Sequence, residues 1–241
     1  MARPTVGLLG GSGLRDRSVL EDDEPRALET PYGSPSDAPR IGRHGSRTVV
    51  FLPRHGKGHR TPPHRINHRA NLWALRELGV TQVLATSSTG SLRKPIAPGT
   101  FVVPHDYVGF WNVPTFHDEE VAHVTPVLDD ELRAVLVHAA KSEGQNVRTK
   151  GVYVQTTGPR LETVAEIAFF RTLGDVLGMT MASEATLATE LGLRYASLCS
   201  VDNFCNGIVD RPLTFAQIQE TQRRNAVAVR AILRRAVELI P

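Results

Sequence analysis

The amino-acid sequence predicts a single α/β domain that spans residues 1–241. This length is ordinary for one domain with a sizeable core, and the 41% hydrophobic and 22% charged residues are typical of a globular protein. Short apolar runs lead into glycine-rich or polar loops, and stretches with helical spacing follow them. The sequence contains neither an internal repeat nor a low-complexity linker, so we expect one domain.

The first predicted strand, Thr5–Leu9, runs directly into the glycine-rich segment Gly10–Gly13. Glycine allows a tight turn in which successive N–H groups point at an anion, and Ser12 adds a hydroxyl donor. The dinucleotide-binding pattern GxGxxG needs a third glycine, but the residues after Gly13 are LRD. A Rossmann dehydrogenase is therefore disfavoured.

A loop-rich region with a short hairpin (residues 15–47) precedes the next predicted strand, Thr48–Leu52, which ends in PRHGKGHR. This ending favours an oxyanion site, because Arg54 can fork two oxygens and His55 can donate another hydrogen bond. Histidine phosphatases also carry an Arg-His-Gly triplet, but directly after their first strand. A metal site is disfavoured because neither a carboxylate nor a cysteine accompanies the histidines and arginines are dense. Those histidines are His55, His59, His64 and His68.

The other elements follow from apolar spacing and from glycine punctuation. Helices are predicted at His64–Leu78, Asp129–Ser142, Val164–Leu173, Glu184–Leu191 and Thr214–Ile240, and strands at Gln82–Ala85, Thr100–Val103, Tyr107–Phe110, Asp175–Met181 and Arg194–Val201. The hydroxyl-rich run Thr86–Ser91 is expected to form a second loop of donors. With Gly10–Gly13, Arg54 and His55 it would make one anion site.

A second candidate site lies in GVYVQTTGPRLETVAE, residues 151–166. The β-branched run predicts a strand, Gly158-Pro159 breaks it, and a helix begins at about Thr163. Glu162 offers a carboxylate beside the apolar Leu161, and this combination suits a flat heterocycle with an N–H edge. The alternative is that Glu162 only caps the helix or is solvated.

Charge and cysteine content limit the possible partners. The net charge of +3 is small and the arginines are dispersed, so a nucleic-acid partner is not expected. Cys199 and Cys205 are the two cysteines, too few for a disulfide framework in this chain. The sequence has neither a membrane-length apolar run nor a signal-peptide layout, and these features predict a cytoplasmic protein.

Seven segments together carry a family resemblance: GGSGL, PRHGKGH, NHRANLWALRELG, SSTGSL, QTTGPRLETVAE, GMTMASEATLA and YASLCSVDN. The chain resembles the trimeric purine nucleoside phosphorylase superfamily, and in particular its 5′-methylthioadenosine/S-methyl-5′-thioinosine phosphorylase branch. This resemblance implies a mixed, distorted barrel-like sheet and a homotrimer that serves purine salvage. It also implies a pentosyltransferase with inorganic phosphate as co-substrate and with neither a metal nor an organic cofactor.

The resemblance also implies roles for individual residues. The phosphate-binding positions of the family correspond to Ser12, Arg54, His55, Ser87, Ser88 and Thr180. Met179 belongs with Thr180 to the segment that touches the sugar and phosphate, and Leu161 stands where relatives stack an aromatic ring. His123 matches a residue that relatives lend to the pocket of a neighbouring subunit. Phosphate must be held below the anomeric carbon while the departing base is stabilised.

The base is expected to be a 6-oxopurine. Such a base presents an N1–H donor for Glu162, and its O6 and N7 acceptors suit the amide of Asn203. The resemblance places asparagine at this strand end in 6-oxopurine enzymes and aspartate in 6-aminopurine enzymes. Asp202 is the alternative, because side chains alternate along a strand and a bulge would exchange the two residues. Catalysis is assigned to Asn203, Glu162 and His55.

At the 5′ end of the nucleoside, Phe215 and Ile218 suggest an apolar pocket, although both could simply face the core. The predicted reaction is therefore phosphorolysis of S-methyl-5′-thioinosine to hypoxanthine and 5-methylthioribose 1-phosphate. Inosine or guanosine, and 5′-methylthioadenosine, are the alternative substrates. Two further hypotheses are a phosphatase that uses His55 and a purine-binding protein without catalysis.

Overall fold

The computed structural model describes residues 5–12, 14, 19–111 and 113–241. Its strands are β1 (Thr5–Gly10), β2 (Glu21–Pro25), β3 (Arg40–His44), β4 (Arg47–Pro53), β5 (Val80–Ser91), β6 (Phe101–Val102), β7 (Asp106–Gly109), β8 (Val147–Arg148), β9 (Val152–Gln155), β10 (Val176–Gly178) and β11 (Arg194–Phe204). In the described chain they form one mixed sheet, in the order β2-β3-β4-β1-β5-β10-β9-β7, from which β11, β6 and β8 branch at β5.

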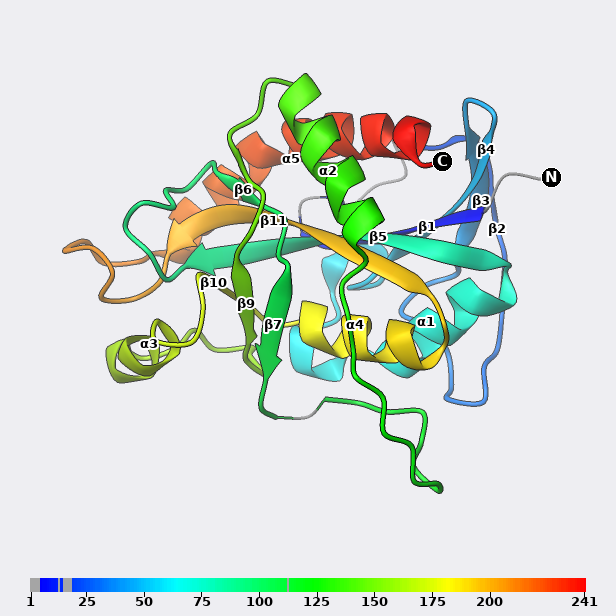
Figure 1. Ribbon diagram of the computed structural model, residues 1–241, viewed down its shortest axis with the longest axis horizontal. Helices are drawn as coiled ribbons and strands as arrows, with labels where there is room; N and C mark the ends of the chain where they lie inside the picture. Colours follow the sequence, from blue (N-terminus) through cyan, green and yellow to red (C-terminus); the bar gives the residue numbers. More distant parts are fainter. Residues whose placement is uncertain (1–4, 13, 15–18, 112) are drawn as a thin grey trace.

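Helices cover both faces of this sheet (Figure 1). They are α1 (His68–Glu77), α2 (Asp130–Ser142), α3 (Val164–Phe170), α4 (Met181–Glu190) and α5 (Phe215–Leu239). In the view of Figure 1, α2 and α5 lie above β5 and β11, and α1 and α4 lie below. The predicted α/β fold with a mixed sheet flanked by helices is therefore confirmed.

The strands at the centre are buried on both faces. Leu8 and Leu9 of β1 are both fully buried, but Leu8 belongs to the core cluster under α2 and α5, and Leu9 to the cluster on the other side. Successive side chains of a strand point to opposite faces. Parallel strands between two helical layers need apolar residues at consecutive positions, which explains the continuous apolar run of Thr5–Leu9.

The carboxyl ends of four parallel strands meet at one edge of the sheet. β1 pairs in parallel with β4 and β5, and β5 pairs in parallel with β11. The register sets Gly10 opposite Pro53 and Leu9 opposite Ala85. The loops after β1 and β4 therefore lie beside the second half of β5, in the position where open α/β sheets bind ligands.

Several predicted boundaries are wrong by three residues or more, among them the end of α3 at Phe170, the start of α4 at Met181 and the end of β11 at Phe204. Three of the errors have a clear local reason. The helix expected at His64 begins at His68, because residues 63–65 form a short 3₁₀ turn and Asn67 caps α1 by accepting from the Ala70 N–H. The strand expected to reach Met181 ends at Gly178, and Met181 begins α4.

The third error concerns the hydroxyl-rich run, which is not a loop. Thr86–Ser91 continues β5, because β11 runs alongside as far as Phe204 and provides ladder partners. Hydroxyl residues in this run therefore alternate between the two faces of the sheet instead of all facing one ligand.

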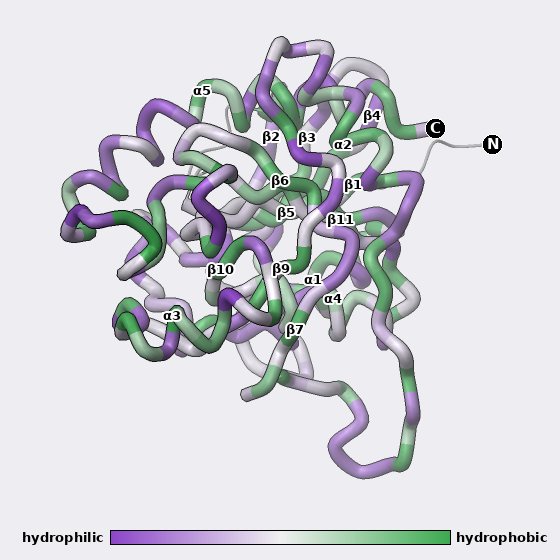
Figure 2. Tube along the Cα trace, turned by 60° about the vertical axis from the view of Figure 1, so that its left-hand side comes forward, coloured by the Kyte–Doolittle hydropathy of each residue, from purple (hydrophilic) through white to green (hydrophobic). Residues whose placement is uncertain are grey.

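The segment between β7 and α2 includes a long loop that projects from the molecule in both views (Figures 1 and 2). Its residues 118–125 are all exposed, whereas Phe116 and Leu128 pack against the core. Val121 is 88% exposed, and Val124 and Val127 are also exposed. Among the described residues, the helices are all too short or too polar to cross a membrane.

The core contribution of α5 can be measured with two valines of the same helix. Val229 is buried and Val227 is 64% exposed. Val229→Ala removes apolar contacts and leaves a cavity, so we expect a loss of about 2 kcal/mol in the free energy of unfolding. Val227→Ala should change it by less than about 0.5 kcal/mol. Denaturant titrations of both variants measure this difference, and equal losses would contradict the assigned orientation of α5.

Candidate functional site

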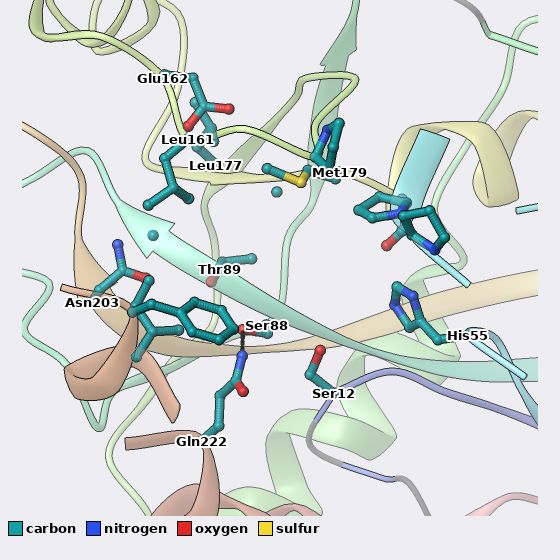
Figure 3. Close-up of a pocket in the computed structure, with 18 of the residues that line it drawn as sticks. Ser12, His55, Ser88, Thr89, Leu161, Glu162, Leu177, Met179, Asn203 and Gln222 are labelled. Atoms are coloured by element: carbon teal, nitrogen blue, oxygen red, sulfur yellow. Dashed lines mark hydrogen bonds between the residues drawn. The ribbon is translucent and has the colours of Figure 1, made fainter. Parts of the chain in front are cut away.

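A cavity of about 420 Å³ opens at the edge where the parallel strands end. It contains eleven of the residues predicted from the sequence: Ser12, Arg54, His55, Ser88, Leu161, Glu162, Met179, Thr180, Asn203, Phe215 and Ile218. Glu162, Leu161 and Asn203 lie at one end, and Ser12 and His55 at the other (Figure 3). The two candidate sites of the sequence are thus the two ends of one cavity.

The guanidinium of Arg54 is held by a buried ion pair. Arg54 Nε and Nη2 donate to the two carboxylate oxygens of Glu184, the Nη2 bond measuring 2.8 Å, and Nη1 donates to the Thr86 carbonyl at 2.7 Å. Both charged side chains are almost completely buried. Burial by itself would lower the pKa of Arg54, but Glu184 raises it above its ordinary value. The pair of parallel hydrogen bonds that the sequence predicted for a ligand is therefore made with Glu184. Up to two of the five N–H groups of the guanidinium remain for the cavity.

Gly11 allows this arrangement. A Cβ atom at Gly11 would lie 2.5 Å from Arg54 Nη1 and 2.5 Å from the Thr86 carbonyl oxygen. The Gly11 N–H is not directed at the cavity, because it donates to the Thr86 hydroxyl at 2.8 Å. The glycine is needed here for close approach, rather than for presenting its own N–H to an anion as predicted.

His55 is a neutral side chain in this environment. Burial, together with the nearby Arg54 and His59, lowers the pKa of His55 to about 3. Its Nδ1 lies 2.9 Å from the Thr61 carbonyl oxygen, so Nδ1 carries the proton and donates. The other ring nitrogen, Nε2, is then an acceptor. The hydrogen bond that His55 can offer to a ligand has the opposite direction from the predicted one.

At the other end of the cavity, Glu162 is a buried carboxylate. Its Oε1 accepts from the Thr156 hydroxyl at 2.7 Å, and its backbone carbonyl accepts from the Asn206 amide at 2.8 Å. Burial raises the pKa of Glu162, an effect that the Thr156 hydrogen bond opposes. Thr163, rather than Glu162, caps α3, through a capping box with Glu166. Glu162 is therefore not needed as a helix cap.

Asn203 and Asp202 face different surroundings. The register of β11 against β5 shifts between Val201 and Asn203, so Asp202 occupies a bulge. Asn203 lines the cavity, and one N–H of its amide donates to the Phe204 carbonyl at 2.9 Å. Asp202 is 2% exposed and lies outside the lining of this cavity.

Asp202 instead joins three neighbouring side chains. Its carboxylate accepts hydrogen bonds from Ser88, Ser200 and Asn225. Burial raises its pKa to about 6, against these hydrogen bonds. The Ser88 hydroxyl also accepts from Gln222 Nε2 of α5 at 2.8 Å, the bond dashed in Figure 3. Ser88 therefore presents lone pairs rather than a proton to the cavity.

Two predicted residues lie outside the cavity. Ser87 points to the other face of β5, where its hydroxyl lies 3.4 Å from the Ser197 hydroxyl. His123 is exposed in the loop between β7 and α2 and does not line the cavity of its own chain. Strand alternation explains the position of Ser87. The predicted role of His123 concerns a neighbouring subunit.

Comparison with known proteins identifies the family. The sequence profile of the Phosphorylase superfamily matches residues 5–238. The chain belongs to the phosphorylase superfamily. It is 42% identical, over 98% of its length and 96% of the relative's, to a protein of Archaeoglobus fulgidus named as a probable 6-oxopurine nucleoside phosphorylase.

Two further relatives of this phosphorylase differ in their named substrates. A probable S-methyl-5′-thioinosine phosphorylase of Methanothermobacter thermautotrophicus is 45% identical, over 89% of this chain and 77% of the relative. The methylthioadenosine phosphorylase of Schistosoma mansoni, solved with adenine, superposes with a TM-score of 0.90 at 33% identity, over 98% of this chain and 92% of that chain. The names therefore cover both 6-oxo and 6-amino bases.

Sequence reasoning missed several residues of this phosphorylase cavity and its support. They are Glu184, Thr156, Cys205, Asn206 and Gln222. The helical spacing of Ile218 and Gln222, four residues apart, was a usable signal, because both lie on one face of α5. Glu184 gave no such signal, since its partner Arg54 is 130 positions away. Among the described residues, His, Cys, Asp and Glu side chains do not form a group of three or more that could hold a metal ion.

The buried ion pair generates a stability prediction. Glu184→Gln keeps the shape of the side chain but leaves the Arg54 charge uncompensated in a buried position. We expect a loss of about 3 kcal/mol in the free energy of unfolding, or roughly 6–12 °C in Tm. Calorimetry measures this loss. Glu220→Gln, an exposed carboxylate on α5, is the control and should shift Tm by less than about 2 °C.

Proposed function

We propose that this enzyme is a purine nucleoside phosphorylase, a pentosyltransferase that cleaves 6-oxopurine nucleosides with inorganic phosphate. The best candidate substrate is S-methyl-5′-thioinosine, which would give hypoxanthine and 5-methylthioribose 1-phosphate. The observation that carries this proposal is that Glu162 and Asn203 both line one end of the cavity, while Ser12 and His55 line the other. The names of the relatives from Archaeoglobus fulgidus and Methanothermobacter thermautotrophicus support it.

The base end favours a keto-purine. A carboxylate accepts the N1–H of hypoxanthine, whereas adenine has a lone pair at N1 that would face the carboxylate unpaired. The Asn203 amide retains one N–H, which can donate to O6 or N7 of the base, since both of these atoms are acceptors. An unpaired polar group in such a pocket costs about 1–3 kcal/mol. This cost is the proposed origin of selectivity against the 6-amino base.

The other end of the cavity suits hydrogenphosphate. The remaining N–H groups of Arg54 would donate to ionised phosphate oxygens, and the neutral His55 Nε2 would accept the proton of the P–O–H group. Phosphate oxygen would then attack the anomeric carbon as the bond to the base nitrogen breaks, with its electron pair moving onto the purine. The Asn203 N–H would stabilise the negative charge that develops on that base, while Glu162 would hold the base in place through its N1–H. The released base would then take up a proton from solvent.

The 5′ group has two candidates. Phe215 and Ile218 line the cavity and offer an apolar surface for a methylthio group. Gln222 of the same helix also lines it, and this polar side chain is the observation that keeps inosine and guanosine as the second candidate substrates. The base-binding argument is the same for both classes of nucleoside.

The proposal includes a homotrimer, a cytoplasmic location and catalysis without a metal or organic cofactor. An exposed aromatic cluster supports assembly. Phe110, Trp111 and Phe169 are each about half exposed, and the ring of Phe110 contacts the rings of both Trp111 and Phe169. Exposed apolar clusters of this kind are typical of subunit interfaces. His123, on its projecting loop, would then serve the cavity of a neighbouring subunit.

A substrate panel tests the reaction. The enzyme is incubated with S-methyl-5′-thioinosine, 5′-methylthioadenosine, inosine and guanosine, with and without phosphate, and the released base is measured. We expect phosphate-dependent release of hypoxanthine, fastest from S-methyl-5′-thioinosine. Phosphate produced from phosphoesters would indicate the phosphatase hypothesis instead, and binding without base release would indicate a purine-binding protein.

Asn203→Asp tests base selection. The added carboxylate accepts from a 6-amino group and repels O6, so the ratio of kcat/KM for S-methyl-5′-thioinosine to that for 5′-methylthioadenosine should fall about tenfold or more. Asn146→Asp is the matched control, because it makes the same chemical change at an exposed residue between α2 and β8 that does not line the cavity, and it should leave the ratio within about threefold. An unchanged ratio in the Asn203 variant would mean that this side chain does not contact the base.

A further inference from the structure

The carboxylate at the base end is supported from behind by Thr156. The Thr156 hydroxyl donates to Glu162 Oε1 at 2.7 Å, while its distance to the Gly178 carbonyl oxygen is 3.5 Å. A hydroxyl has one proton, so the shorter contact identifies the carboxylate as the acceptor. The backbone N–H of Thr156 donates to the same Gly178 carbonyl at 2.9 Å, which fixes Thr156 between the ends of β9 and β10.

Thr156 stands outside the cavity that holds the site residues. It lines a neighbouring cavity of about 480 Å³, which shares Pro63 and Met179 with the first cavity. Both side chains of the pair are buried, with 8% of Thr156 and 7% of Glu162 exposed. The Thr156 hydroxyl therefore acts on a ligand in the first cavity through the carboxylate that it contacts.

We infer that Thr156 is a positioning residue that holds Glu162 ionised and correctly oriented to accept the N1–H of a 6-oxopurine. The hydroxyl occupies one carboxylate oxygen and leaves the other, Oε2, for the base. This inference rests on the proposed function of the cavity, since it assigns Thr156 a part in recognising that base.

Among the groups around Glu162, Thr156 contributes most to stabilising the negative charge of its carboxylate. Burial raises the pKa of Glu162, and the Thr156 hydrogen bond is the leading interaction that lowers it. Among the charged neighbours, Arg160 and Glu166 form an exposed ion pair with each other, so their effects on Glu162 largely cancel. From the other side, the end of β11 contributes the buried, neutral thiol of Cys205.

The sign of the expected pH effect follows from this balance. Base recognition needs the ionised carboxylate, so activity is lost as pH falls through the pKa of Glu162. Removing the Thr156 hydroxyl removes a hydrogen bond to the charged form, which raises that pKa further. The acid limb of the pH profile should therefore move to higher pH, by about one unit for one hydrogen bond to a charged group.

The test compares Thr156→Ala with Thr156→Ser, two variants that differ by a single oxygen atom, and adds the isosteric Thr156→Val. For each, kcat/KM for S-methyl-5′-thioinosine is measured from about pH 4.5 to 8 and divided by the wild-type value at the same pH, so that the ionisation of phosphate cancels. We expect the Ala and Val ratios to fall about tenfold toward low pH, and the Ser ratio to stay flat near one.

Thr157→Val is the matched control, because it makes the same chemical change at the exposed neighbouring residue and should leave the profile unchanged. Equal activity losses at all pH values, without rescue by serine, would show a merely structural role and overturn the inference. If the wild-type enzyme releases base from neither S-methyl-5′-thioinosine nor inosine, the proposed function itself fails, whatever the variants do.

Discussion

The buried ion pair between Arg54 and Glu184 organises the site. Arg54 follows β4 and Glu184 lies in the first turns of α4, so the pair joins the end of a strand to the helical layer formed by α1 and α4. Thr86 of β5 accepts from the same guanidinium, and the Tyr195 hydroxyl of β11 donates to the same carboxylate at 2.8 Å. Four elements are thus fixed around one charge pair. Burying two charges is costly, and it is tolerated here because most of their polar atoms have partners.

This arrangement determines the electrostatic character of one end of the cavity. Glu184 cancels most of the Arg54 charge, and His55 is neutral because burial and the neighbouring cation disfavour its protonation. The anion-binding end therefore carries directed hydrogen bonds more than net charge. Directed groups that need no rearrangement are well suited to stabilise a reacting anion and a departing base.

The two ends of the cavity are built differently. At the anion end, Arg54 is fixed by the buried ion pair, and His55, which follows it after β4, is fixed by the Thr61 carbonyl. At the base end, Glu162 lies on a loop and is held by two side chains, that of Thr156 directly after β9 and that of Asn206 in the segment after β11. The sheet therefore positions the reaction centre. Two hydrogen bonds, from Thr156 and Asn206, position Glu162, the group that selects the base. Such a division allows base selectivity to change without disturbing the anion site.

The sequence predicted a large part of the site because the relevant residues follow strands. Arg54 and His55 come directly after an apolar run, and Glu162 lies between a strand and a capped helix, so local patterns located them. Local patterns could not show which face of a strand a residue occupies once that strand was taken for a loop. Ser87 was therefore assigned to the anion site, although it points away from the cavity.

By itself, the sequence determined the α/β class, the helix caps and the strand ends at which the site forms, because apolar periodicity and capping residues act over a few positions. The tertiary structure alone decided which partners these groups have. It paired Arg54 with Glu184, placed Asp202 in a bulge so that Asn203 lines the cavity, and set Thr156 behind Glu162. Those outcomes depend on strand register and on contacts between segments far apart in the chain, which short-range patterns do not encode.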